Sequence, residues 1–150
     1  MQIKQTRDTM SEIYCDALRI RNTVFVKEQG VPFELEVGSP VDEAHSVHFV
    51  GYEAGNALAT VRLLVDPSDK THALVQRMAV LKEARGKGYA NALLQQLLEF
   101  SKKSGLTLLT HHAQLSAKDL YEKFGFEVQG EIFKEAGIDH ITMTYDKFTE

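Results

Sequence analysis

The residues best suited to do chemistry form a basic, glycine-containing loop at positions 85–90, with the sequence RGKGYA. Its two glycines allow backbone N–H groups to approach a ligand closely. The apolar run before the loop predicts a strand, and the apolar residues after it recur at the spacing of one helical face. The start of that helix adds the positive end of a helix dipole. A strand, a basic loop and a helix in this order are suited to holding phosphate.

Two common phosphate-binding loops do not fit this stretch. A nucleoside-triphosphatase loop needs Ser or Thr after its Gly-Lys pair to reach magnesium, and Gly88 stands there instead. A dinucleotide fingerprint needs a third glycine three residues further on, where this chain has Asn91. A basic turn that only caps an ordinary helix explains this sequence about as well as a phosphate-binding loop does. The loop by itself therefore leaves the ligand open.

Composition narrows the class of protein. The chain has 150 residues, a formal charge of −4 and 25% charged residues, which predicts one domain over residues 1–150 with a substantial core. The basic loop is a local patch on an acidic chain, which favours a small anionic ligand over nucleic acid. No apolar run is long enough to span a membrane and no signal-peptide core is present, so we expect a cytoplasmic protein without membrane contact. Cys15 is expected to be a buried structural thiol, and His111-His112 lacks zinc-site spacing, so we expect no metal.

The order of predicted elements indicates an α/β fold, in which a mixed sheet carries helices on both faces. Thr9 and Glu12 form a capping-box pattern before the first helix. Segment 30–44 has no periodicity and several acids, so it is read as either a solvated loop or a binding element. The predicted elements are a strand at 2–6, a helix from about 10 to the mid-twenties, strands at 45–54 and 57–65, a strand at 74–81, a helix from 90 to about 104, a strand at 106–112, a helix capped by Ser116 that ends near 124, and strands at 126–133 and 138–148.

Several motifs occur in a fixed order along the chain. They are RxxVFVxEQ from Arg21, the single residues His48, Arg62 and Arg77, the loop from Arg85, Ala113-Gln114, YxxxGF from Tyr121 and GIxH from Gly137. Together they resemble the GNAT N-acetyltransferases, in particular the ElaA/YjcF-like subgroup. The resemblance covers essentially the whole chain and implies the acyl-CoA N-acyltransferase fold, with a mostly antiparallel sheet of about seven strands. The chain departs from the pattern at Ala90, Asp139 and His111-His112.

The resemblance implies acetyl-CoA as co-substrate. Backbone groups of Met78, Ala79 and Val80 would pair with the pantetheine arm as though it were an added strand. The pyrophosphate would be held by N–H groups of the loop and the helix start, with Arg85 adding charge. The implied cofactor-binding residues are Met78, Ala79, Val80, Arg85, Gly86, Lys87, Gly88, Tyr89, Ala90, Asn91 and Gln114.

Tyr121 is the residue that the resemblance implies as the general acid. Its hydroxyl would donate to the departing sulfur. Without the family match, a tyrosine on a short amphipathic helix is a packing residue.

The acceptor side is less defined. A lysine-like amine has a pKa of about 10.4 and must lose a proton before it attacks. The base is left open among histidines and acids that include Glu36 and Glu43. For Arg62 and Arg77 we rank ion pairing with buried carboxylates ahead of contact with substrate. The candidate substrate-binding residues are Arg21, Glu28, Gln29, His48, His111 and His140.

Two functions remain, and they belong to different classes. The favoured one is an N-acetyltransferase that moves the acetyl group of acetyl-CoA to a primary amine of a small molecule or a protein in a ternary complex. The alternative is a non-catalytic acyl-CoA-binding module that acts through partner contacts. Acetyl-CoA and an amine acceptor are the expected partners, and self-association into a homodimer is left open.

Overall fold

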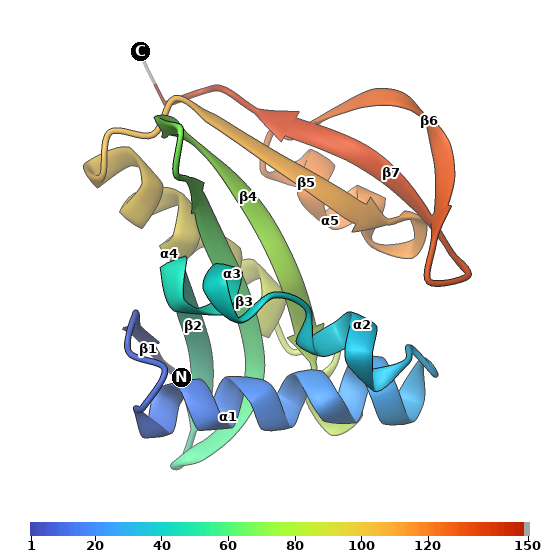
Figure 1. Cartoon of the computed structure of the whole chain (residues 1–150). Helices are drawn as coiled ribbons and strands as arrows, with labels where there is room; N and C mark the ends of the chain where they lie inside the picture. The colour runs from blue at the N-terminus through green and yellow to red at the C-terminus, as the bar shows by residue number, and fades with distance from the viewer. Residues whose placement is uncertain (149–150) are drawn as a thin grey trace.

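A seven-stranded mixed sheet forms the centre of the computed structural model, which describes residues 1–148 (Figure 1). The strands are β1 (Gln2–Thr6), β2 (Ser46–Glu53), β3 (Asn56–Asp66), β4 (Asp69–Val80), β5 (Leu108–Gln114), β6 (Glu127–Glu135) and β7 (Ile138–Tyr145). Their order across the sheet is β1-β2-β3-β4-β5-β7-β6. Only β4 and β5 pair in parallel, and every other neighbouring pair is antiparallel. The predicted mostly antiparallel mixed sheet is confirmed.

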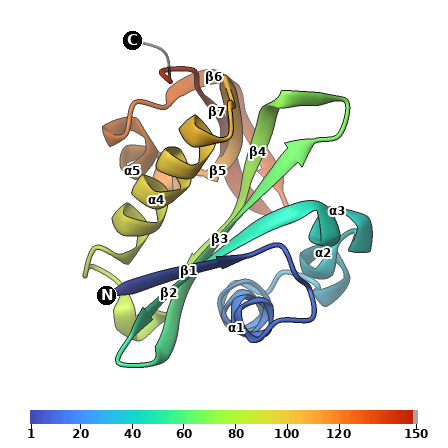
Figure 2. The same cartoon turned by 90° about the vertical axis from the view of Figure 1, so that its left-hand side faces the viewer.

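Helices cover both faces of the sheet, as predicted from the order of elements. The helical segments are α1 (Glu12–Arg21), the π-helix η1 (Asn22–Glu28), α2 (Phe33–Val37), α3 (Pro40–His45), the 3-10 turn η2 (Lys82–Ala84), α4 (Tyr89–Lys103), the 3-10 turn η3 (Leu115–Ala117) and α5 (Lys118–Lys123). Figure 2 shows α1, α2 and α3 on one face of the sheet and α4 and α5 on the other.

Helix α4 anchors the core on its face of the sheet. Leu93, Leu94 and Leu97 are fully buried and belong to the same apolar cluster as Phe49 of β2 and Val61 of β3. These leucines are the apolar stripe that the sequence predicts, and their burial fixes where the helix begins. The N-terminal end of α4 is thereby held beside the end of β4.

Strands β4 and β5 separate part of the way along the sheet. They pair only where His72–Val75 lies beside Leu108–His111, and beyond that point they diverge (Figure 1). A register shift in the β3–β4 pairing leaves Arg77 and Met78 opposite the single residue Val61, which is a β-bulge. Arg77 takes φ +59°, the left-handed region that non-glycine residues rarely occupy. The result is a fork in the sheet between β4 and β5.

The start of the first helix was predicted incorrectly. Helix α1 begins at Glu12, and its N-cap is Ser11, whose hydroxyl accepts from the Tyr14 N–H. Thr9 lies in the preceding turn and caps nothing. Ser11 sits directly before the first helical residue, so its oxygen reaches the unpaired N–H groups of the first turn.

Two other predicted local features were wrong. Segment 30–44 is not irregular, because it contains α2 and α3, and Ser39 caps α3 with Pro40 at the first helical position. Ser116 does not cap α5, since it lies within η3 and the capping position belongs to Ala117. Helices of five or six residues are too short to show periodicity in the sequence.

Cys15 is exposed, whereas a buried thiol was expected. The buried residues of α1 are Ala17, Ile20 and Arg21, which lie together on the side that faces the sheet. Cys15 is two residues before Ala17 and therefore points about 200° away around the helix.

Candidate functional site

The fork between β4 and β5 opens into a cleft of about 390 Å³. Its walls come from η1, α2, β4, β5, η3, α5 and the hairpin of β6 and β7. Six of the predicted catalytic, cofactor-binding and substrate-binding residues line it, namely Gln29, Met78, His111, Gln114, Tyr121 and His140. The cleft thus brings together side chains from five separate parts of the chain.

One side of the cleft is an open strand edge. Ala79 and Val80 pair with Thr60 and Ala59 of β3, but on the side toward β5 the pairing of β4 stops at Val75. The edge that includes Met78 therefore offers backbone groups to an extended ligand. The side chains of Ala79 and Val80 do not line the cleft.

The glycine loop lies at the N-terminal end of α4. Gly86 and Gly88 take φ +76° and +85°, which favour glycine. Apart from the neighbouring residues in the chain, no atom lies within 4 Å of where a Cβ at Gly88 would stand. The first helical hydrogen bond runs from the Ala92 N–H to the Gly88 carbonyl, at 3.0 Å, and no side chain caps the helix. The N–H groups of residues 89–91 therefore lack helical partners, which makes this end of the helix suited to an anion.

Loop side chains differ in exposure. Arg85, Lys87 and Asn91 are exposed, Ala90 is half-buried and Tyr89 is buried in the core. An anion at this helix end would therefore meet solvent-facing cations as well as backbone donors.

Arg85 is engaged by a carboxylate. Its two terminal nitrogens donate to Glu28 at 2.6 and 2.7 Å, and its Nε donates to the Val80 carbonyl at 3.0 Å. Glu28, predicted on the acceptor side, lies outside the cleft and instead joins the end of η1 to the loop. The hydrogen bond from Arg85 lowers the pKa of the Glu28 carboxyl. A phosphate at the loop would compete with Glu28 for this guanidinium.

Tyr121 stands inside the fork with an unsatisfied hydroxyl. The residue is 1% exposed, and its hydroxyl has no hydrogen-bond partner within residues 1–148. Its ring packs at 4.3 Å from that of His111 and at 5.5 Å from that of Phe126, measured between centroids. Burial raises the pKa of the Tyr121 phenol, so it keeps its proton at neutral pH. A buried donor of this kind calls for an acceptor.

His111 connects the two arms of the fork. Its Nδ1 lies 2.6 Å from the Val75 carbonyl oxygen, and because a carbonyl only accepts, Nδ1 carries the hydrogen. Burial lowers the pKa of His111 to about 4, so the ring is neutral at pH 7. Its Nε2 therefore retains a lone pair.

His140 lines the cleft from β7. Its Nδ1 donates to the Ile138 carbonyl at 2.7 Å, and its Nε2 is 3.7 Å from a carboxylate oxygen of Glu135. The ring stacks on Phe133 at 5.9 Å between centroids. Gln29 and Gln114 pair their amides reciprocally at 2.8 and 3.3 Å, which links the end of η1 to the end of β5.

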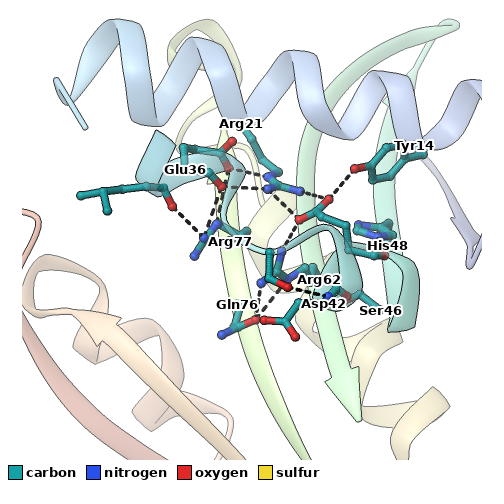
Figure 3. A network of polar contacts seen from close by, with 12 residues as sticks. Tyr14, Arg21, Glu36, Asp42, Ser46, His48, Arg62, Gln76 and Arg77 are labelled. Atoms are coloured by element: carbon teal, nitrogen blue, oxygen red, sulfur yellow. Dashed lines mark hydrogen bonds and ion pairs between the residues drawn. The ribbon is translucent and has the colours of Figure 1, made fainter. Parts of the chain in front are cut away.

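A buried network of arginines and glutamates lies beside the cleft (Figure 3). Arg21 donates from Nε to Glu36 at 2.6 Å and from Nη1 to Glu43 at 2.9 Å. Glu43 also accepts from Tyr14 at 2.6 Å and pairs with Arg62. All four charged residues are buried. The network ties α2 and α3, which carry the two acids, to α1 and the sheet.

Arg77 extends this network to the cleft. Its Nε is 3.4 Å from Glu36, and its Nη2 donates to the Leu35 and Glu36 carbonyls, each at 3.3 Å. The predicted ion pairing of Arg62 and Arg77 with buried carboxylates is confirmed. Arg77 differs from Arg62 because it also lines the cleft.

Besides Glu28, two more of the predicted substrate-binding residues, Arg21 and His48, lie away from the cleft. Arg21 is 1% exposed within the network. His48 is fully buried, and its Nε2 donates to the Glu43 carbonyl at 3.0 Å. Burial lowers the pKa of His48. Both residues bond to the segment that contains α2 and α3 and hold it against α1 and the sheet.

Some cleft residues were not anticipated from the sequence. They are Glu135, the last residue of β6, and Ala136 in the turn that follows it. Val31 and Leu35 also line the cleft, as expected if segment 30–44 is a binding element. Nothing in a single sequence places the end of β6 and its turn beside the fork. Within residues 1–148, no group of His, Cys, Asp or Glu is arranged to hold a metal ion. No helix in this part of the chain is long and apolar enough to cross a membrane.

Comparison with known proteins identifies relatives over most of the chain. The acetyltransferase (GNAT) domain family matches residues 24–147. YjcF of Bacillus subtilis, an uncharacterized N-acetyltransferase, is 32% identical over 132 residues, which is 87% of this chain and 91% of YjcF. The crystal structure of Escherichia coli ElaA superposes with a TM-score of 0.84 at 22% identity, covering 97% of this chain and 100% of ElaA. An acyl-CoA N-acyltransferase from Pseudomonas aeruginosa gives 0.82 at 24% identity, covering 96% and 99%.

The buried network yields a stability prediction for Glu43. Burial alone would raise the pKa of the Glu43 carboxyl, but hydrogen bonds from Arg21 and Tyr14 and the charge of Arg62 lower it to about 2. Glu43→Gln leaves two buried guanidiniums short of a counter-charge, so the free energy of unfolding should fall by about 3–5 kcal/mol. Urea unfolding at pH 7 measures this, with Glu34→Gln on the exposed side of α2 as the matched control. Equal stability of the two variants would contradict the assignment.

The pKa of His111 yields a prediction about acid stability. A histidine whose pKa is about 4 in the folded state and 6.5 when unfolded binds a proton more readily after unfolding. Its contribution is fully present above pH 6.5 and is lost as the pH falls toward 4, by up to about 3 kcal/mol. His111→Gln keeps a donor for the Val75 carbonyl but does not titrate, so its stability should fall less steeply over this range. Parallel curves for the wild type and this variant, with the exposed His112→Gln as control, would refute the prediction.

Proposed function

The chain belongs to the GNAT acetyltransferase family, and we propose that it transfers the acetyl group of acetyl-CoA directly to a primary amine of a small molecule or a protein. The observation that carries this proposal is the buried Tyr121 hydroxyl, which stands in the fork without a partner. The fork also has an open strand edge on one arm. An acyl carrier lying along that edge would supply the missing acceptor.

Binding of the co-substrate would use two features of the chain. The pantetheine arm lies along the open edge of β4 at residues 78–80, where main-chain groups are free of strand partners on that side. The pyrophosphate lies at the N-terminal end of α4, where the N–H groups of residues 89–91 lack helical partners. Arg85 adds charge there when it exchanges Glu28 for phosphate. GNAT proteins use acetyl-CoA as co-substrate, and these features fit it.

The transfer itself needs one bond formed and one broken. The neutral amine nitrogen bonds to the thioester carbonyl carbon, and an N–H on the β4 edge stabilises the oxyanion. The carbon–sulfur bond then breaks, the nitrogen loses a proton and the thiolate takes one up, so the products are an amide and free CoA. Tyr121 donates to the sulfur as the thiolate forms. Because burial raises the pKa of this phenol, its main contribution is a hydrogen bond to the developing charge.

His111 is assigned a positioning role. With a pKa of about 4 it is too weak a base to take a proton from an alkylammonium group at pH 7. Its hydrogen bond to the Val75 carbonyl instead fixes the point at which β4 and β5 part. The ring then holds Tyr121 in place through their contact.

A single substitution tests the role of the Tyr121 hydroxyl. Tyr121→Phe keeps the ring but removes the donor, so the rate of CoA release should fall on the order of 10²-fold. The melting temperature and the affinity for acetyl-CoA should stay close to wild type. Turnover is measured with a panel of primary amines, and single-turnover kinetics establish that chemistry limits the rate. Tyr52→Phe, which removes a hydroxyl that donates to Asp16, is the matched control and should retain the wild-type rate.

Two outcomes would count against this account. If Tyr121→Phe releases CoA at the wild-type rate, the Tyr121 side chain contributes packing only and its hydroxyl has no part in the transfer. Acetyl-CoA that binds without CoA release on any amine would favour the non-catalytic acyl-CoA-binding module.

A further inference from the structure

Arg77 is held in an unusual backbone conformation at the edge of the cleft. It occupies the left-handed region at the β4 bulge, which costs a residue with a side chain on the order of 1–3 kcal/mol. Its side chain is 26% exposed and lines the cleft. Met78, the next residue, lies on the open edge assigned to the pantetheine arm. The bulge thus places a guanidinium directly beside the proposed site of transfer.

The charges around Arg77 do not balance. The ion pairs of the network join the guanidiniums of Arg21, Arg62 and Arg77 to the carboxylates of Glu36 and Glu43. Within ion-pair distance, three cations therefore share two anions, and Arg77 is the cation at the end of the network that opens to the cleft. Glu135 on the cleft wall also acts on Arg77 by its charge, but it forms no ion pair with Arg77 among residues 1–148. Tyr14 and Gln76 complete the network with neutral groups.

The hydrogen bonds of Arg77 are also incomplete. Glu36 accepts a 2.6 Å hydrogen bond from Arg21, whereas Arg77 Nε lies 3.4 Å from the same oxygen. This Nε is buried and makes no hydrogen bond to any part of residues 1–148. Burial and the charge of Arg21 lower the pKa of Arg77, as expected where negative charge is in short supply.

The guanidinium is nevertheless fixed in place. Its Nη2 donates to the carbonyls of Leu35 and Glu36, and Figure 3 shows Arg77 reaching from its strand toward α2. Both carbonyls are neutral, so they orient the cation without neutralising it. A fixed guanidinium with a surplus charge is suited to a planar anion with two oxygens.

We propose that Arg77 binds a carboxylate of the acceptor, so that the substrate is an amino acid or another amine that bears a carboxylate. This proposal rests on the proposed function, because it places the carboxylate beside the amine that attacks the thioester. Phe25, Val31 and Leu35 line the same cleft and provide an apolar wall for the rest of the acceptor. A carboxylate on the acyl group of the donor would present the same chemistry to Arg77, and the experiment separates the two sources.

The test compares amino acids with their decarboxylated amines. L-phenylalanine is paired with 2-phenylethylamine, L-leucine with 3-methylbutylamine and β-alanine with ethylamine, each with acetyl-CoA. We expect kcat/KM to favour the carboxylate-bearing member in at least one pair. Arg77→Asn should reduce that preference on the order of 10- to 100-fold, the usual effect of losing a hydrogen bond to a charged group. Asn is chosen because it tolerates the left-handed region.

Two further variants serve as controls. Arg77→Lys keeps the charge but loses the planar fork, so its preference should be intermediate. Arg19→Asn removes one positive charge from an exposed position on α1, and its preference should equal that of the wild type. Circular dichroism and melting curves establish that each variant folds.

Three results would overturn the proposal. The first is an unchanged preference in a folded Arg77→Asn, and the second is a wild-type enzyme that favours the decarboxylated amine in every pair. The third is an Arg77-dependent preference for succinyl-CoA over acetyl-CoA with 2-phenylethylamine, which would place the carboxylate on the donor.

The proposed function can fail separately from this carboxylate site. If no amine releases CoA, each amino acid is titrated calorimetrically into the protein saturated with CoA. Binding that is lost in Arg77→Asn would support the carboxylate site while refuting turnover. Absence of binding by all three amino acids would overturn the carboxylate site as well.

Discussion

The separation of β4 from β5 after Val75 is the constraint on which the rest of the site depends. Two neighbouring strands of one sheet normally pair their backbone N–H and C=O groups along their whole length. A fork must therefore be imposed by something other than these hydrogen bonds. Here the bulge at Arg77 and Met78 bends β4, and the His111 ring occupies the point of divergence with its bond to the Val75 carbonyl. An open edge, a cleft and a buried tyrosine hydroxyl all follow from that separation.

The second arrangement that shapes the site is the buried set of arginines and glutamates. Short helices such as α2 and α3 bury little apolar surface, so hydrophobic packing alone holds them weakly. Glu36 and Glu43 compensate by bonding to Arg21 and Arg62, which project from α1 and the sheet. The network thereby builds the acceptor side of the cleft. It also leaves the positive charge of Arg77 only partly neutralised, because Arg77 shares Glu36 with Arg21.

The sequence predicted those parts of the fold that depend on local pattern. It gave the apolar stripe of α4, the glycine loop and the order of the strands. These features depend on hydrophobic periodicity and on turn-forming residues, and both can be recognised from residues close together in the chain. The buried acids were not placed, since Glu36 and Glu43 bond to an arginine 15 and 22 residues earlier in the chain and nothing local marks the pairing. Cys15 was misjudged because a short helix with mixed residues does not reveal which face is buried.

The candidate site divides in the same way. The loop and Tyr121 could be singled out because motifs of a known family mark them. The placement of Glu135 beside the fork and the link between Arg85 and Glu28 arise only from tertiary contact. Arg77 was predicted to pair with a buried carboxylate, and it lies beside Glu36. Its left-handed backbone and its surplus charge appear only in three dimensions.

The central claim is that acyl-CoA binds in the fork as an added strand, and residue-resolved hydrogen exchange tests it most directly. Exchange is measured by NMR on the whole chain with and without saturating acetyl-CoA. The account predicts slower exchange for backbone amides on the open edge at residues 78–80 and at the helix start, residues 86–91, because both sets gain acceptors. Binding of acetyl-CoA that leaves both sets unchanged and protects amides elsewhere would contradict it.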